Sequence, residues 1–124
     1  MTDFLTDEQA AAKLARITVK TVKSYQVTVF IGGDLELAKA ACQKFCDERG
    51  ECVTVETTDY IYTNGSTEGV RVGFINYARF PRTRRVIFDQ AVELARWLLI
   101  ALDQESVSVV ASDKTLWLTT REQS

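Results

Sequence analysis

Histidine is absent from this sequence, and its absence excludes several kinds of chemistry. A Ser-His-Asp triad, a Cys-His dyad and a zinc site that needs imidazole all depend on that side chain. The three cysteines are odd in number and form no Cys-x-x-Cys pair, which argues against a framework of disulfides. Free cysteines are typical of a reducing compartment.

Long apolar runs are also missing. The first twenty residues begin acidic and lack the apolar segment of a secretory signal. The longest apolar stretch, Trp97–Leu102, is far shorter than a membrane-spanning helix requires. We therefore expect a cytoplasmic protein that does not associate with membranes.

What remains is the composition of an ordinary globular protein. With 124 residues, a net charge of −2 and 46% hydrophobic residues, the chain is expected to fold as one domain, 1–124. Within it we expect an N-terminal arm over 1–24, a core over 25–119 and a polar tail over 120–124.

Periodicity and capping residues predict the elements of this core. Thr6 and Gln9 form a capping box for a short N-terminal helix, Asp34 and Thr83 are N-caps of two longer helices, and Asn64-Gly65 is a turn signal. The expected elements are strand Tyr25–Ile31, helix Leu35–Arg49, strand Glu51–Tyr62, loop Thr63–Gly69, strand Val70–Tyr77, a helix from Thr83 to about Asp103, and strands Ser106–Ala111 and Thr115–Thr119.

This order predicts an α+β fold: an antiparallel sheet with two helices on one face. The central β-α-β-β-α-β segment has the ferredoxin-like order, with an N-terminal helix and an extra C-terminal strand. Two helices cannot bury all of Tyr60, Tyr62, Phe74, Tyr77 and Trp117. We therefore expect the second sheet face to bind a ligand or a partner.

Most other candidate sites have a plainer interpretation. The three cysteines Cys42, Cys46 and Cys52 lack a fourth metal ligand, so we interpret them as small core residues. Gly32-Gly33-Asp34 is far from a nucleotide-binding fingerprint and is interpreted as a turn with an N-cap. Acidic residues of the first half form no recognisable acid–base pair.

The strand Arg71–Tyr77 partly matches the third strand of an RNA recognition motif. Phe74 and Tyr77 are three residues apart, however, so they point to opposite faces of a strand. The negative net charge also argues against general nucleic-acid binding.

The strongest local signal is the basic segment Tyr77–Arg85, in which four arginines surround Phe80 and Pro81. Arginine binds phosphate oxygens and stacks on bases, and Phe80 or Tyr77 could complete a base sandwich. The alternative is a solvated patch that pairs with acids of a neighbouring subunit. An anion-binding role and this structural role are both left open.

The chain resembles phage-encoded Thoeris anti-defence proteins. The resemblance rests on Tyr60–Thr63, Gly69–Pro81 and Val109–Trp117, roughly the C-terminal half. It implies a homo-oligomeric protein of an infected or prophage-bearing bacterium, which sequesters a cyclic ADP-ribose isomer without turnover. A sponge needs no nucleophile, so the missing histidine is compatible with this expectation.

We therefore expect a non-enzymatic binding protein with no cofactor and no metal, whose partner is a small nucleotide signal, either a cyclic ADP-ribose isomer or a cyclic oligonucleotide. The candidate ligand-binding residues are Arg71, Asn76, Tyr77, Arg79, Phe80, Arg82, Arg84, Arg85 and Trp117. The alternatives are an inhibitor that binds a host enzyme, an RNA-recognition-like domain, and a histidine-free metal-dependent phosphoesterase that uses Asp34 and Asp59.

Overall fold

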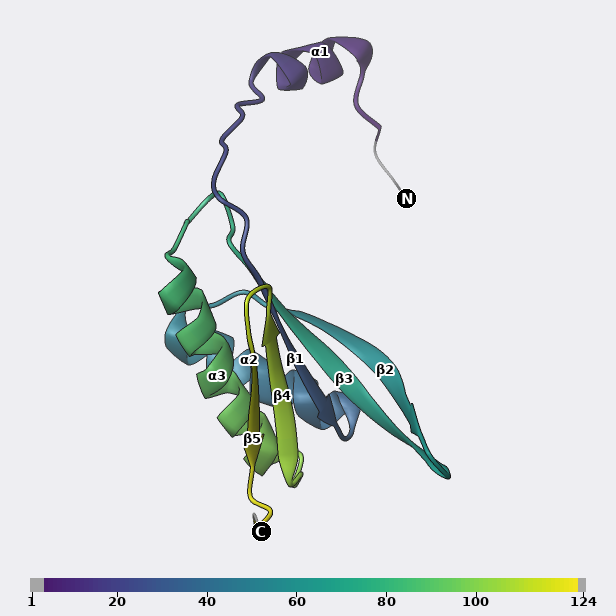
Figure 1. Cartoon of the computed structure of the whole chain (residues 1–124). Helices are drawn as coiled ribbons and strands as arrows, with labels where there is room; N and C mark the ends of the chain where they lie inside the picture. Colours follow the sequence, from purple (N-terminus) through teal and green to yellow (C-terminus); the bar gives the residue numbers. More distant parts are fainter. Residues whose placement is uncertain (1–3, 123–124) are drawn as a thin grey trace.

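A five-stranded antiparallel sheet forms the centre of the molecule in the computed structural model, which describes residues 4–122 (Figure 1). The strand order is β2-β3-β1-β4-β5, as the ferredoxin-like order with one extra edge strand predicts. The elements are α1 (Asp7–Ala15), β1 (Gln26–Gly32), α2 (Leu35–Arg49), β2 (Thr54–Tyr62), β3 (Gly65–Ile75), α3 (Arg84–Ala101), β4 (Ser106–Ala111) and β5 (Thr115–Thr119).

Helices α2 and α3 cover one face of this sheet, and the core lies between them and the strands (Figure 1). Alternate strand residues point to this side, so Val27 and Val29 of β1 are buried, as are Val107 and Val109 of β4. Leu94 of α3 packs against them and is fully buried. The predicted α+β class is confirmed.

Local chemistry fixes where the helices begin and end. The Asp34 side chain accepts a hydrogen bond from the backbone N–H of Leu37, and Thr83 accepts one from that of Val86. Gly50 ends α2 in the left-handed region, with φ 66°. No helix within residues 4–122 is long and apolar enough to cross a membrane.

Helix α1 stands apart from the rest of the molecule, on an extended segment that enters β1 (Figure 1). It has the predicted capping box, in which Thr6 and Gln9 exchange hydrogen bonds of 3.1 and 2.8 Å. None of its residues is buried.

The predicted loop Thr63–Gly69 is wrong. Strand β3 begins at Gly65, so only Thr63 and Asn64 connect it to β2. Asn64 adopts φ 63°, which lets a two-residue turn close the hairpin. The second strand also begins later than expected, because the N–H of Glu51 donates to the Cys46 carbonyl and so belongs to the end of α2.

Candidate functional site on the open sheet face

The sheet face that α2 and α3 leave uncovered is called the outer face here. Strand pairing places one residue of each strand side by side across it: Glu56 with Arg71, Arg71 with Phe30, Phe30 with Ser108, and Ser108 with Trp117. We call these five residues the outer row. It combines two opposite charges, a hydroxyl and two aromatic rings, none of which the core requires.

A hollow of about 380 Å³ lies beside the outer row, where β1 and β4 meet the α3–β4 loop. Its size is within the range of small-molecule sites. Its lining residues are Phe30, Ile31, Gly32, Tyr60, Thr67, Asp103, Gln104, Glu105, Ser106, Ser108 and Arg121. We call this space the outer-face hollow.

Glycine keeps the outer-face hollow open. A Cβ atom on Gly32 would lie 3.1 Å from Oε1 of Gln104 and 3.3 Å from Cγ2 of Thr67, both of which line the hollow. A Cβ on Gly69 would overlap the Tyr60 ring and the Ile31 carbonyl oxygen. Glycine at these two positions therefore lets Tyr60 lie flat along the sheet.

Tyr60 is a fixed aromatic wall of the outer-face hollow. Its hydroxyl donates a 2.8 Å hydrogen bond to the Val70 carbonyl. Burial raises the pKa of its phenol above the ordinary value, although the nearby Arg71 charge acts in the opposite direction. The phenol is therefore protonated at neutral pH and is a poor general base.

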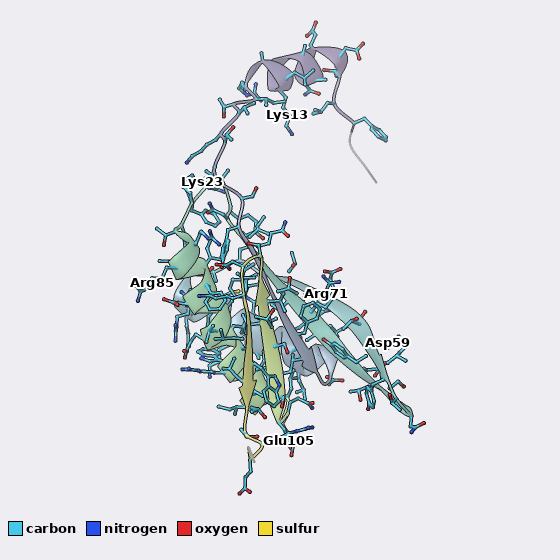
Figure 2. The ribbon with its side chains drawn as sticks, in the orientation of Figure 1. Lys13, Lys23, Asp59, Arg71, Arg85 and Glu105 are labelled. Carbon is cyan, nitrogen blue, oxygen red and sulfur yellow. The ribbon has the colours of Figure 1, made fainter. Side chains whose placement is uncertain are left out.

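Carboxylates lie at the loop end of the hollow, near the position of Glu105 in Figure 2. Asp103 and Glu105 flank Gln104, and Nε of Arg121 donates a 2.9 Å hydrogen bond to Glu105. The hollow thus offers two carboxylates, one of them bound to Arg121, together with one amide and two aromatic rings. These acceptors and flat surfaces suit a nucleoside with hydroxyl groups.

Arg71 extends this site along the outer row (Figure 2). Its guanidinium carbon lies 5.2 Å from the centre of the Phe30 ring, within the range of a cation–π contact. Phe30 also lines the outer-face hollow, so Arg71 is at the border of that hollow.

The predicted basic segment lies at the end of the sheet where the α1 arm enters. There Arg82 forms an ion pair with Glu51 and donates a 2.9 Å hydrogen bond to the Gly50 carbonyl. Its backbone N–H donates to Asn76 Oδ1 at 2.9 Å, while Nδ2 of Asn76 donates to the Lys23 carbonyl at 2.8 Å. Asn76 and Arg82 therefore join three loops of the chain.

Other arginines of this segment have acidic partners too. Arg84 lies 3.1 Å from Asp113 and stacks over Tyr25, with 4.8 Å from its guanidinium carbon to the ring centre. Arg85 lies 3.7 Å from Asp89. The alternative prediction for this segment was a solvated patch that pairs with acids of a neighbouring subunit. The arginines do pair with acids, but these acids belong to the same chain.

The nine predicted ligand-binding residues therefore fall into two groups. Seven lie at this basic end: Asn76, Tyr77, Arg79, Phe80, Arg82, Arg84 and Arg85. The Tyr77 and Phe80 rings pack together there, 5.7 Å between centres. Arg71 and Trp117 instead share the outer row, so the two groups occupy different places on the sheet. Whether any of the nine binds a ligand stays a prediction.

Sequence reasoning missed Phe30, Glu56, Asp103 and Glu105. Phe30 and Glu56 lie in predicted strands, whereas Asp103 and Glu105 lie in the α3–β4 loop, where the predicted helix was expected to end at about Asp103. The signal that could have found Phe30 and Glu56 is strand alternation, since both fall between inward-facing residues of their strands.

The interpretation of the three cysteines as core residues is confirmed only for Cys42. Cys42 is buried, and burial raises the pKa of its thiol to about 12. Cys46 is half-buried and Cys52 is exposed. Within residues 4–122 no group of three or more Cys, Asp or Glu side chains is placed to hold a metal ion.

Two solved structures share the fold of this chain. One is described as a phage SAM lyase in the apo state, at 14% identity and a TM-score of 0.66, covering 81% of this chain and 92% of that one. The other is a phage SAM lyase in complex with S-methyl-5′-thioadenosine, at 11% identity and a TM-score of 0.62, covering 87% and 98%. No model of a known protein family matches the sequence, and no curated protein does.

These likenesses contradict the predicted function. The solved relatives in fold are SAM lyases, so the resemblance to Thoeris anti-defence proteins is wrong. The expectation of a non-enzymatic sponge, with its alternatives of a host-enzyme inhibitor or an RNA-recognition-like domain, is wrong for the same reason. The predicted ligand, a cyclic ADP-ribose isomer, is wrong as well, because one of those proteins binds S-methyl-5′-thioadenosine.

Proposed function

We propose that this chain is a SAM lyase, which cleaves S-adenosylmethionine to S-methyl-5′-thioadenosine at the outer-face hollow. The observation that carries the proposal is a nucleoside-sized hollow, with two rings and two carboxylates, on a fold shared with two SAM lyase structures. By the same likeness we propose a phage protein that acts against host defence by consuming the methyl donor.

Charge favours the outer-face hollow over the other spaces on the surface. S-adenosylmethionine carries a carboxylate, an ammonium and a sulfonium, so its net charge is positive. The 510 Å³ hollow at the basic end is lined by Arg84, Arg85 and Lys114, with Asp89 and Asp113 as the acids. The 560 Å³ groove between α2 and α3 is largely apolar. Neither matches a cationic nucleoside as well as the outer-face hollow.

The residues of the outer-face hollow divide naturally among the parts of the substrate. The rings of Phe30 and Tyr60 offer flat surfaces for adenine and for the sulfonium cation. Asp103 and Glu105 offer acceptors for the two ribose hydroxyls. Trp117, at the far end of the outer row, is a further stacking surface.

The reaction requires no histidine if the substrate supplies its own nucleophile. A carboxylate oxygen of the methionine moiety attacks the Cγ carbon that carries the sulfur. The new C–O bond closes a five-membered lactone while the Cγ–S bond breaks, and its electron pair neutralises the sulfonium. No proton is transferred, so the protonated Tyr60 phenol is no obstacle, and the protein contributes chiefly by orienting the chain.

A direct test is to incubate the protein with S-adenosylmethionine and identify the products by mass spectrometry. We expect S-methyl-5′-thioadenosine and a four-carbon lactone in equal amounts. A Ser108→Phe variant, which fills the outer-face hollow, is expected to lose at least tenfold in rate.

Val110→Phe is the matched control. Val110 is the next outward-facing residue of β4 but does not line the hollow, so its variant should keep most of the activity. Recovery of intact substrate in the presence of excess wild-type protein would overturn the proposal. Equal rates for Ser108→Phe and the wild type would show that the reaction does not take place at the outer-face hollow.

A further inference from the structure

We infer that Glu56 and Arg71 form a pair that recognises the zwitterionic amino-acid end of the substrate and thereby determines which adenosyl sulfur compounds are used. This inference rests on the proposed function and adds a specificity determinant to the same site. In it, Arg71 binds the α-carboxylate and Glu56 binds the α-ammonium.

The two side chains are neighbours that do not neutralise each other. Glu56 of β2 and Arg71 of β3 are directly opposite in the sheet, and both are exposed on the outer face. Directly opposite residues have Cβ atoms about 5 Å apart. Yet among the ion pairs of residues 4–122 none joins them, because the Arg71 guanidinium lies over Phe30 instead. An acid and a base are therefore both presented to a ligand.

No other charge on these two strands competes with the pair at close range. The outward-facing residues on either side of it are Thr54 with Gly73 and Thr58 with Gly69. All four are uncharged, and the ring of Tyr60, further along β2, covers Gly69. A carboxylate and an ammonium on one carbon atom match this isolated pair of opposite charges.

The position of the pair connects the amino-acid end with the nucleoside. Phe30 lies under the Arg71 guanidinium and also lines the outer-face hollow. A substrate with its carboxylate on Arg71 thus places its sulfonium over Phe30 and its nucleoside in the hollow.

This arrangement distinguishes substrate from product. S-methyl-5′-thioadenosine has no amino-acid end and makes no contact with the pair. The pair therefore strengthens the binding of the amino-acid-bearing compound and leaves that of the product unchanged.

The test compares two unreactive ligands by calorimetry. S-adenosylhomocysteine carries the amino-acid end, whereas S-methyl-5′-thioadenosine does not. We expect Arg71→Gln and Glu56→Gln each to lower the affinity for S-adenosylhomocysteine about tenfold or more, as loss of a hydrogen bond to a charged group does. The affinity for S-methyl-5′-thioadenosine should change less than twofold. Arg71→Lys should recover part of the loss.

Arg96→Gln is the matched control, because Arg96 is an exposed arginine of α3, on the other side of the sheet. It should change neither affinity. Equal weakening of both ligands by Arg71→Gln, or no change in either, would overturn the inference while leaving the lyase proposal intact. Failure of the wild type to bind either ligand would overturn both.

Discussion

Two arginines of this chain illustrate how surroundings decide the role of one residue type. Arg82 is 28% exposed and its partner Glu51 only 10%, so this ion pair is largely removed from water. Arg85 is 91% exposed and its contact with Asp89 is screened. Clustering in sequence made them look equivalent, but only Arg82 joins separate segments of the fold.

We predict that Arg82→Ala destabilises the protein by about 1–3 kcal/mol, because it leaves the Glu51 carboxylate poorly solvated and unpaired. Arg85→Ala should change the free energy of unfolding by less than about 0.5 kcal/mol. Urea titrations followed by circular dichroism would measure both. Similar values for the two variants would show that the Glu51 pair contributes no more than a surface contact.

At the scale of elements, strands and helices were predictable where a local rule determines them. Strand alternation gave β4 and β5 with their observed bounds, and the caps Thr6, Asp34 and Thr83 marked the helix starts. The β2–β3 hairpin was predicted, but its connection was predicted too long, because seven polar residues looked like a loop. In the structure most of them pair across two exposed strands that extend beyond the helices.

The candidate site was harder to predict than the elements. Its residues come from β1, β2, β3, β4, the α3–β4 loop and Arg121 after β5, so no single stretch of the sequence carries the site. The four clustered arginines gave a stronger signal, but Arg82 and Arg84 are paired with acids of the same chain. Only the sheet register brings Glu56, Arg71 and Phe30 together.

Helix α1 should contribute little to stability, since it has no buried residue. A nine-residue helix is marginal by itself. We predict that removing residues 1–22 changes the free energy of unfolding by less than about 1 kcal/mol, whereas Leu94→Ala in α3 costs about 3–5 kcal/mol. Urea unfolding of both proteins checks this, and a large loss in the truncated chain would contradict it.

For the whole molecule, groups that the folded state keeps protonated link stability to alkaline pH. Burial raises the pKa of Cys42 to about 12. The hydrogen bond with Cys52, and then burial, raise that of Tyr77 to about 12 as well. Both values exceed those of the unfolded chain, so above about pH 9 the folded state holds more protons than the unfolded state. The free energy of unfolding must therefore fall as the pH rises from 9 towards 12.

We predict that Cys42→Ala makes this fall less steep. A difference of one bound proton changes the free energy of unfolding by about 1.4 kcal/mol per pH unit, and the variant lacks the proton that Cys42 holds. Urea titrations at several pH values from 8 to 11 would give the slopes. Parallel curves for variant and wild type would show that the Cys42 thiol does not contribute.

The one-sided covering of the sheet has a consequence for how this protein can change. Along each central strand, residues that hold the core and residues that face the outer row alternate one by one. Neighbouring positions are therefore under different constraints: one set holds the core, and the other forms the surface on which the proposed site lies. Outward positions that are not glycine can therefore change with little risk to the core, whereas a Cβ atom at Gly69 or Gly73 would overlap neighbouring atoms. If the proposed site lies on this surface, its non-glycine positions are a favourable starting point for directed evolution.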